Sequence, residues 1–180
     1  MENIYLFILI ALIVLAFADL IVGVSNDAVN FLNSAIGSKV LSFKTLMIIA
    51  SIGVFVGCVY SSGMMEVARK GIFNPGEFLF NEIMIIFMAV MITDILILDL
   101  FNSWGLPTST TVSIVFELLG ASVAMALIKI GVDNGSFTDL ATYINTSKAT
   151  QIILGILLSV FVAFSIGAIV QWVSRLLLSY

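Results

Sequence analysis

Charged residues, histidine and cysteine are scarce in this sequence. Only 10% of its 180 residues are charged, it has no histidine, and Cys58 is its single cysteine. Without histidine or a recognisable pair of nucleophile and base, the usual catalytic constellations are missing, so we expect neither an enzyme nor a cofactor. One cysteine excludes a disulfide within the chain. A soluble domain is about 25% charged, which argues against that class, and a net charge of −4 suggests no nucleic-acid partner.

The sequence consists largely of long apolar runs. Hydrophobic residues make up 61% of the sequence, and the runs fall approximately at 4–24, 42–62, 83–101, 109–130 and 151–173. Each is close to the roughly 20 residues that a helix needs to cross a bilayer core. We therefore predict an all-α integral membrane protein, a helical bundle that forms a single transmembrane domain over residues 1–180, and we expect it to be a multi-pass protein of the plasma (inner) membrane.

Small residues recur at four-residue spacing in two of these runs. Gly53 and Gly57 form one pair, and a second stripe consists of Gly155, Ser159, Ala163 and Gly167. Because small residues let helices approach closely in lipid, we expect both stripes to be packing surfaces.

Several carboxylates lie within or beside the apolar runs: Asp19, Asp27, Asp94, Asp99 and Glu117. A carboxylate facing lipid at mid-depth costs about 2.5 kcal/mol or more, so it normally faces a cavity or a partner. Stretches 4–38 and 83–128 contain no lysine or arginine to serve as that partner. The carboxyls must therefore be protonated, hydrogen-bonded to amides and hydroxyls, or bound to a cation from solution. For Asp99 and Glu117, simple exposure to water is an equal alternative.

The first polar cluster is GVSNDAVNFLNSAIGSK, residues 23–39, directly after the first apolar run. At helical spacing Asn26, Asn30 and Asn33 share one stripe, and Asp27 and Ser34 flank it. Their oxygens suit a hard cation such as Na⁺.

Poor helix formers stand at the start of this cluster. Gly23 and the Ser25-Asn26 pair favour caps over helix interiors, which predicts a helix that breaks near 23–26 and restarts inside the protein. The restarted N-terminus would offer free amides and a positive dipole end to an anion.

The second polar cluster is FNSWGLPTSTTVS, residues 101–113. Gly105 and Pro107 interrupt a helix, and Ser109, Thr110 and Thr111 open a new one. Charge is absent from 102–111, which is unusual for a loop in water. We therefore predict a re-entrant helical hairpin with a buried tip at 104–110, since non-helical backbone at membrane depth occurs only inside protein or beside a cavity. Transporters point such broken helices at anionic substrates.

At these two clusters the sequence resembles the inorganic phosphate transporter (PiT) family of secondary carriers. The family signature, roughly GANDVANAFGTSVGSK, is matched by Asn26, Asp27, Asn30, Ser34, Gly37, Ser38 and Lys39. The hairpin motif, roughly GLPVSTTH, is matched by Gly105, Leu106, Pro107, Ser109, Thr110 and Thr111. The sequence departs from the pattern at Ser25, which is an extra residue, at Val112, where the family has histidine, and at Val54, where it has glutamate.

The resemblance implies a symporter of inorganic phosphate coupled to a cation, with sodium favoured and a proton as the alternative coupling ion. Family members carry two inverted halves, each with one signature, and this chain has one copy. It therefore corresponds to one half of an inverted-repeat transporter, whose partner would be a second inverted half in the same chain or in a homo-oligomer. The implied phosphate ligands are Ser34, Ser109, Thr110 and Thr111. The implied sodium ligands are Asn26, Asp27 and Asn30, with Asp94 as a further cation ligand or a proton carrier.

Two alternatives stay open. One is a carrier of another oxyanion such as sulfate, and the other is a non-transporting membrane subunit or scaffold held together by its small-residue faces.

Overall fold

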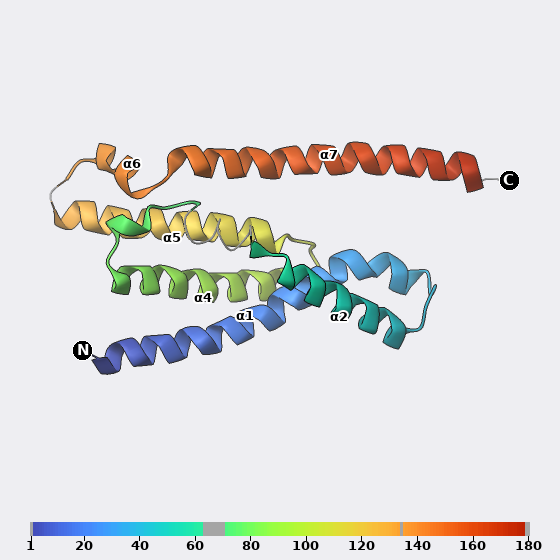
Figure 1. Ribbon diagram of the computed structural model, residues 1–180, viewed down its shortest axis with the longest axis horizontal. Helices are drawn as coiled ribbons and strands as arrows, with labels where there is room; N and C mark the ends of the chain where they lie inside the picture. The colour runs from blue at the N-terminus through green and yellow to red at the C-terminus, as the bar shows by residue number, and fades with distance from the viewer. Residues whose placement is uncertain (1, 63–70, 134, 179–180) are drawn as a thin grey trace. The chain divides into compact units, whose positions relative to one another are not determined.

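The computed structural model describes residues 2–62, 71–133 and 135–178, and it divides into two compact units, Met1–Asn145 and Thr146–Tyr180. The first unit contains the helices α1 (Glu2–Gly37), α2 (Phe43–Val59), α4 (Phe80–Trp104), α5 (Thr110–Val132) and α6 (Leu140–Tyr143), with short 3₁₀ helices η1 (Pro75–Glu77) and η2 (Phe137–Asp139). The second unit is the helix α7 (Thr146–Leu178). In the first unit α4 packs against both α1 and α5, and the three lie side by side (Figure 1). The prediction of a helical bundle is confirmed for this unit.

Four of the described helices are long enough to span a membrane. Stretches Ile4–Gly37, Phe80–Trp104, Thr110–Val132 and Thr146–Leu178 are long and apolar enough to cross a bilayer, and α2 is a shorter apolar helix. Each of the five predicted runs therefore falls on a helix. Because large apolar side chains such as Phe17, Phe55 and Phe164 are exposed, these faces are suited to lipid or to other apolar helices. The chain is a multi-pass membrane protein.

The predicted break in the first helix is wrong. Helix α1 runs without interruption from Glu2 to Gly37. Ser25 does not cap a new helix, because its hydroxyl donates to the carbonyl of Ile21 one turn earlier at 2.7 Å. A glycine inside a helix costs only about 1 kcal/mol relative to alanine. Breaking the helix in an apolar setting costs several kcal/mol for each backbone group left without a hydrogen bond. The continuous helix is therefore the more stable form.

The hairpin formed by α4 and α5 has its tip where the sequence places it. Helix α4 ends at Trp104, Gly105 adopts a left-handed φ of +68°, and α5 begins at Thr110 after the N-cap Ser109. The two arms have 25 and 23 residues. At 1.5 Å per residue both exceed the roughly 30 Å of a bilayer core. The chain thus forms a hairpin of two span-length helices. The side chains of Trp104 and Leu106 at its tip are exposed, so the prediction of a re-entrant hairpin with a buried tip is corrected.

A cluster of contacts closes the opposite end of this hairpin. The Nζ of Lys129 lies 3.0 Å from Glu82 Oε2 and donates to the carbonyl of Glu77 at 2.9 Å. The same ammonium group lies 5.6 Å from the ring centre of Phe78 and 5.7 Å from that of Tyr143. Backbone bonds between 72–74 and 143–145 join the two loops at this end. The hairpin is therefore fixed far from its tip.

The glycine stripes predicted as packing surfaces face open space. Among the residues that the structure describes, and apart from the backbone of the same helix, no atom lies within 4 Å of a Cβ placed at Gly53, Gly57, Gly155 or Gly167. Any close packing that these residues support must therefore involve a surface other than the one their own unit provides.

Candidate functional site

Two asparagines of α1 hold the tip of the hairpin. The side-chain amides of Asn26 and Asn30 both donate to the backbone carbonyl of Thr108, at 3.2 and 2.8 Å. Asn26 is 2% exposed. Because the two residues are one helical turn apart, their amides reach the same acceptor. The predicted stripe thus meets the tip, and about 80 residues of sequence separation are bridged at this point.

The carboxylate of Asp27 joins the same contact from the next position of α1. The hydroxyl of Thr110, the first residue of α5, donates to both of its oxygens, at 3.1 Å for Oδ1 and 3.0 Å for Oδ2. Asp27 is half-buried. Both predicted clusters therefore come together, with a charged group at their junction.

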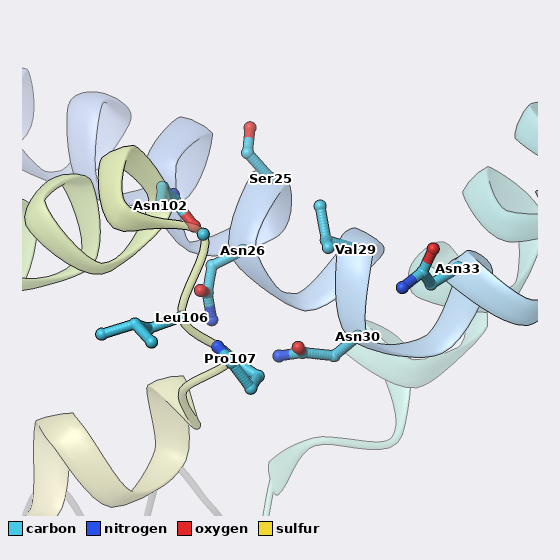
Figure 2. A pocket seen from close by; sticks show the side chains of 9 residues that line it. Ser25, Asn26, Val29, Asn30, Asn33, Asn102, Leu106 and Pro107 are labelled. Atoms are coloured by element: carbon cyan, nitrogen blue, oxygen red, sulfur yellow. The ribbon is translucent and has the colours of Figure 1, made fainter.

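A cavity of about 540 Å³ opens beside this junction. Its lining comes from α1 and from the tip: Ser25, Asn26, Val29, Asn30, Asn33, Asn102, Gly105, Leu106 and Pro107. Figure 2 shows Asn26 and Asn30 pointing toward the tip at Pro107, while Ser25 points away from it. Asn33 lies further along α1 (Figure 2). The lining has four amide side chains and no formal charge, which suits a ligand bound by hydrogen bonds.

The ends of two helices shape the electrostatics of the tip. Helix α4 ends beside the cavity, so its last carbonyls direct the negative end of its dipole there, whereas α5 begins there with its positive end. The hydroxyl of Ser109 accepts from the amide of Val112 at 3.4 Å and caps α5. The tip thus presents a carbonyl-rich edge and the carboxylate of Asp27 to a cation, and the start of α5 to an anion.

The residues predicted for phosphate are not all at this junction. Thr110 contacts Asp27, and Ser109 serves as the cap of α5. Thr111, on the first turn of α5, and Ser34, one turn beyond Asn30, have exposed side chains. None of the hydrogen bonds described for this chain brings Ser34 or Thr111 to the tip.

Asp94 lies elsewhere, in a second group of carboxyls. It is 2% exposed, and its carboxyl lies against those of Asp19 from α1 and Glu117 from α5. The other three residues predicted as sodium ligands, Asn26, Asp27 and Asn30, lie together at the tip. Asp94 therefore lies apart from the residues with which it was expected to bind a cation.

Sequence reasoning did not assign three features of this site. The carbonyl of Thr108 belongs to the backbone, and no side-chain pattern marks it. Asn102 and Asn33 line the cavity. The position of Asn33 on the same stripe as Asn26 and Asn30 was a signal for it. For Asn102, the signal was its place in the uncharged segment of the tip.

The site and fold define a helical membrane protein with a polar, amide-lined site where the tip of a helical hairpin meets another helix. The sequence matches the phosphate transporter family over residues 23–179, and the chain belongs to that family. Membership in a transporter family also confirms the expectation that the chain is not an enzyme.

Three relatives illustrate the similarity, and each carries the name "Putative phosphate permease". The protein of Thermococcus kodakarensis is 28% identical over 137 residues, covering 75% of this chain and 30% of the relative. That of Pyrococcus abyssi is 30% identical over 108 residues, 59% of this chain and 27% of the relative. That of Helicobacter pylori is 30% identical over 105 residues, 57% of this chain and 20% of the relative. No solved structure matches the chain.

The match covers less than a third of the length of each of these relatives.

Proposed function

We propose that this chain contributes half of the substrate site of a phosphate transporter driven by a cation, with sodium as the coupling ion. The observation that carries the proposal is the junction of Asp27 and Thr110, which joins the two family motifs beside an amide-lined cavity. Phosphate binds next to the start of α5, and sodium binds next to Asp27, Asn26 and Asn30.

Charge balance explains why the two ions bind together. The phosphate is an anion, and a neighbouring Asp27 carboxylate repels it. No lysine or arginine occurs in 4–38 or 83–128 to offset this repulsion. A sodium ion that comes from solution and binds to Asp27 offsets this repulsion. Binding of either ion therefore raises the affinity of the site for the other. Oxygen ligands of this kind match the preference of hard cations.

Hydrogen-bonding capacity explains why a second half is needed. One amide-lined cavity and one helix N-terminus leave much of a tetrahedral oxyanion without partners, and unsatisfied polar groups cost several kcal/mol each in an apolar medium. The matching elements come from a second, inverted half, and the open glycine faces of α2 and α7 offer surfaces for it. The assembled protein works in the plasma membrane.

Uptake by proteoliposomes tests the function. Labelled phosphate should enter vesicles that contain the protein when sodium is outside, and replacing sodium by choline should abolish uptake. Excess unlabelled sulfate separates the oxyanions, because competition equal to that of phosphate would assign the site to sulfate as well. Absence of any saturable uptake, in protein that is folded and assembled, would favour the scaffold alternative.

A further inference from the structure

A group of three carboxyls lies in the interior of the three-helix unit, away from the tip. Each comes from a different helix: Asp19 from α1, Asp94 from α4 and Glu117 from α5. The carboxyl of Asp94 is in the middle, since it lies against both of the others. It is among the most deeply buried side chains described, at 2% exposure. The proposed transport site uses none of the three.

Each of these carboxyls has a buried oxygen without a hydrogen-bond partner. The atoms are Asp19 Oδ1, Asp94 Oδ1 and Glu117 Oε2. The other oxygen of Glu117 accepts from the hydroxyl of Ser113 at 2.7 Å. Ionised oxygens buried in this way lack both solvation and a donor, which is among the most unfavourable situations for a polar group. A species that supplies donors must therefore occupy the group.

The cationic side chains described on the surrounding helices do not supply these donors. The charged side chains described on α1, α4 and α5 are Asp19, Asp27, Glu82, Asp94, Asp99, Glu117 and Lys129. Lys129, the one cation among them, is bound to Glu82 at the far end of the hairpin. Asp27 is engaged by Thr110, and Asp99 is exposed. Among the charged side chains described on these three helices, Asp94 thus faces only two further acids.

Protons match this group better than a metal ion does. Among the described residues, no three carboxylate, cysteine or histidine side chains are arranged to hold a metal. A proton placed between two facing carboxyls turns a repulsive contact into a short charge-assisted hydrogen bond, O–H···O⁻. The proton comes from water, and the carboxyl oxygen that receives it becomes the donor to its neighbour.

An access route lies on one side of the group. A cavity of about 340 Å³ between α4 and α5 reaches Glu117. Its remaining lining residues are Ala89, Val90, Thr93, Gly120, Ala121 and Ala124. Small side chains leave this space open, and Glu117 brings the acidic group to its wall.

We propose that Asp19, Asp94 and Glu117 form a proton-binding site that holds α1, α4 and α5 together and thereby regulates the tip. Asp19 is eight residues from Asp27, and Glu117 is seven residues from Thr110, so the two sites are roughly 10–12 Å apart along both helices. Loss of the protons separates α1 from the hairpin and weakens the bonds of Asn26, Asn30 and Thr110. Regulation of the tip rests on the proposed function, whereas proton binding does not.

Infrared spectroscopy on the purified protein in lipid nanodiscs tests the proton site directly. A protonated carboxyl has a carbonyl stretching band that its ionised form lacks. We expect this band in the wild type, and we expect it to disappear as the pH rises. Asp94→Asn keeps the shape of the side chain and should lose most of the band. Asp99→Asn, which changes an exposed acid of the same helix, should keep it.

Several outcomes would overturn the proton site. They are a wild-type spectrum without a titrating band, equal loss of the band in Asp99→Asn, and loss of the band on adding sodium at constant pH, which would make the group a sodium site. The wild-type titration decides the question even where Asp94→Asn does not fold, and Asp19→Asn and Glu117→Gln then replace that variant.

Binding of labelled phosphate, followed over the same pH range, tests the regulation of the tip. We expect affinity to fall in parallel with the band in the wild type, and to depend much less on pH in Asp94→Asn. Phosphate affinity that stays constant while the band disappears would overturn the regulation. Phosphate that binds at no pH while the band still titrates would contradict the proposed function and support the proton site.

Discussion

The hydroxyl of Thr110 donates to both carboxylate oxygens of Asp27, at 3.1 and 3.0 Å, across 83 positions of the sequence. This contact joins the start of α5 to α1. Two amide bonds to Thr108 lie beside it, so three side chains of α1 determine where the hairpin tip lies.

Replacing Thr110 by valine tests the contribution of its hydroxyl. Thr110→Val keeps the branched shape and removes the donor, which leaves Asp27 half-buried without that partner. We expect a loss of about 1–3 kcal/mol in the free energy of unfolding and weaker binding of phosphate. Thermal unfolding in detergent measures the first effect. Thr110→Ser, which restores a hydroxyl, should recover most of both losses, and failure to do so would assign the effect to packing.

The accessibility of the tip tests the role of the asparagines. In a Cys58→Ala background, Thr108→Cys retains the backbone carbonyl that accepts from Asn26 and Asn30. The cysteine should react with small thiol reagents and be protected from bulky ones, and phosphate with sodium should slow the reaction. Adding Asn30→Ala should accelerate labelling, because the shorter of the two tethers is then lost. Labelling by large reagents that is equally fast in all cases would indicate an ordinary exposed loop.

The part of this arrangement that the sequence predicted rests on composition and on local chemistry. Five apolar runs predicted the helices, and Gly105 and Ser109 marked the two sides of the tip through backbone conformation and capping. The predicted break at Gly23 and Ser25 failed because the serine hydroxyl is satisfied inside the helix by Ile21. The prediction from helix propensity took no account of that hydrogen bond.

Other features depend on how the helices rotate about one another. The meeting of Asp19, Asp94 and Glu117 requires three helices to present their acids to one point, which no spacing within a single run specifies. The carbonyl of Thr108 is likewise invisible in a pattern of side chains. The amide cluster was easier to predict, because Asn26 and Asn30 lie one turn apart on a single helix.

The closed end of the hairpin offers a separate test of stability. Lys129→Met keeps the apolar stem and removes the ion pair with Glu82, the bond to the carbonyl of Glu77 and the contacts with two aromatic rings. We expect a loss of about 1–2 kcal/mol in the free energy of unfolding, measured by thermal unfolding. Phosphate affinity should be unchanged, since the tip is at the other end. A large loss of affinity without loss of stability would contradict this separation of roles.

The need for a second half predicts an assembly. Crosslinking and mass measurement in nanodiscs should find the 180-residue chain as an oligomer whenever phosphate uptake or binding is observed. Bulky substitutions at open glycine positions, such as Gly57→Leu, should reduce assembly and activity together, because they obstruct a close helix contact. Saturable phosphate uptake by a preparation that contains only monomers would refute the proposal that one chain supplies only half of the substrate site.

Coupled binding of phosphate and sodium is the most direct test of the central claim, that Asp27 binds the cation which makes phosphate binding possible. Equilibrium binding of labelled phosphate is measured at increasing sodium in the wild type, in Asp27→Asn and in the control Asp99→Asn. Sodium should lower the phosphate Kd by about tenfold or more, equivalent to about 1.4 kcal/mol, and phosphate should tighten sodium binding by the same factor. Asp27→Asn, which can still accept from Thr110, should lose this coupling while the control retains it. Phosphate binding that is independent of sodium, with equal Kd in the wild type and Asp27→Asn, would contradict the account.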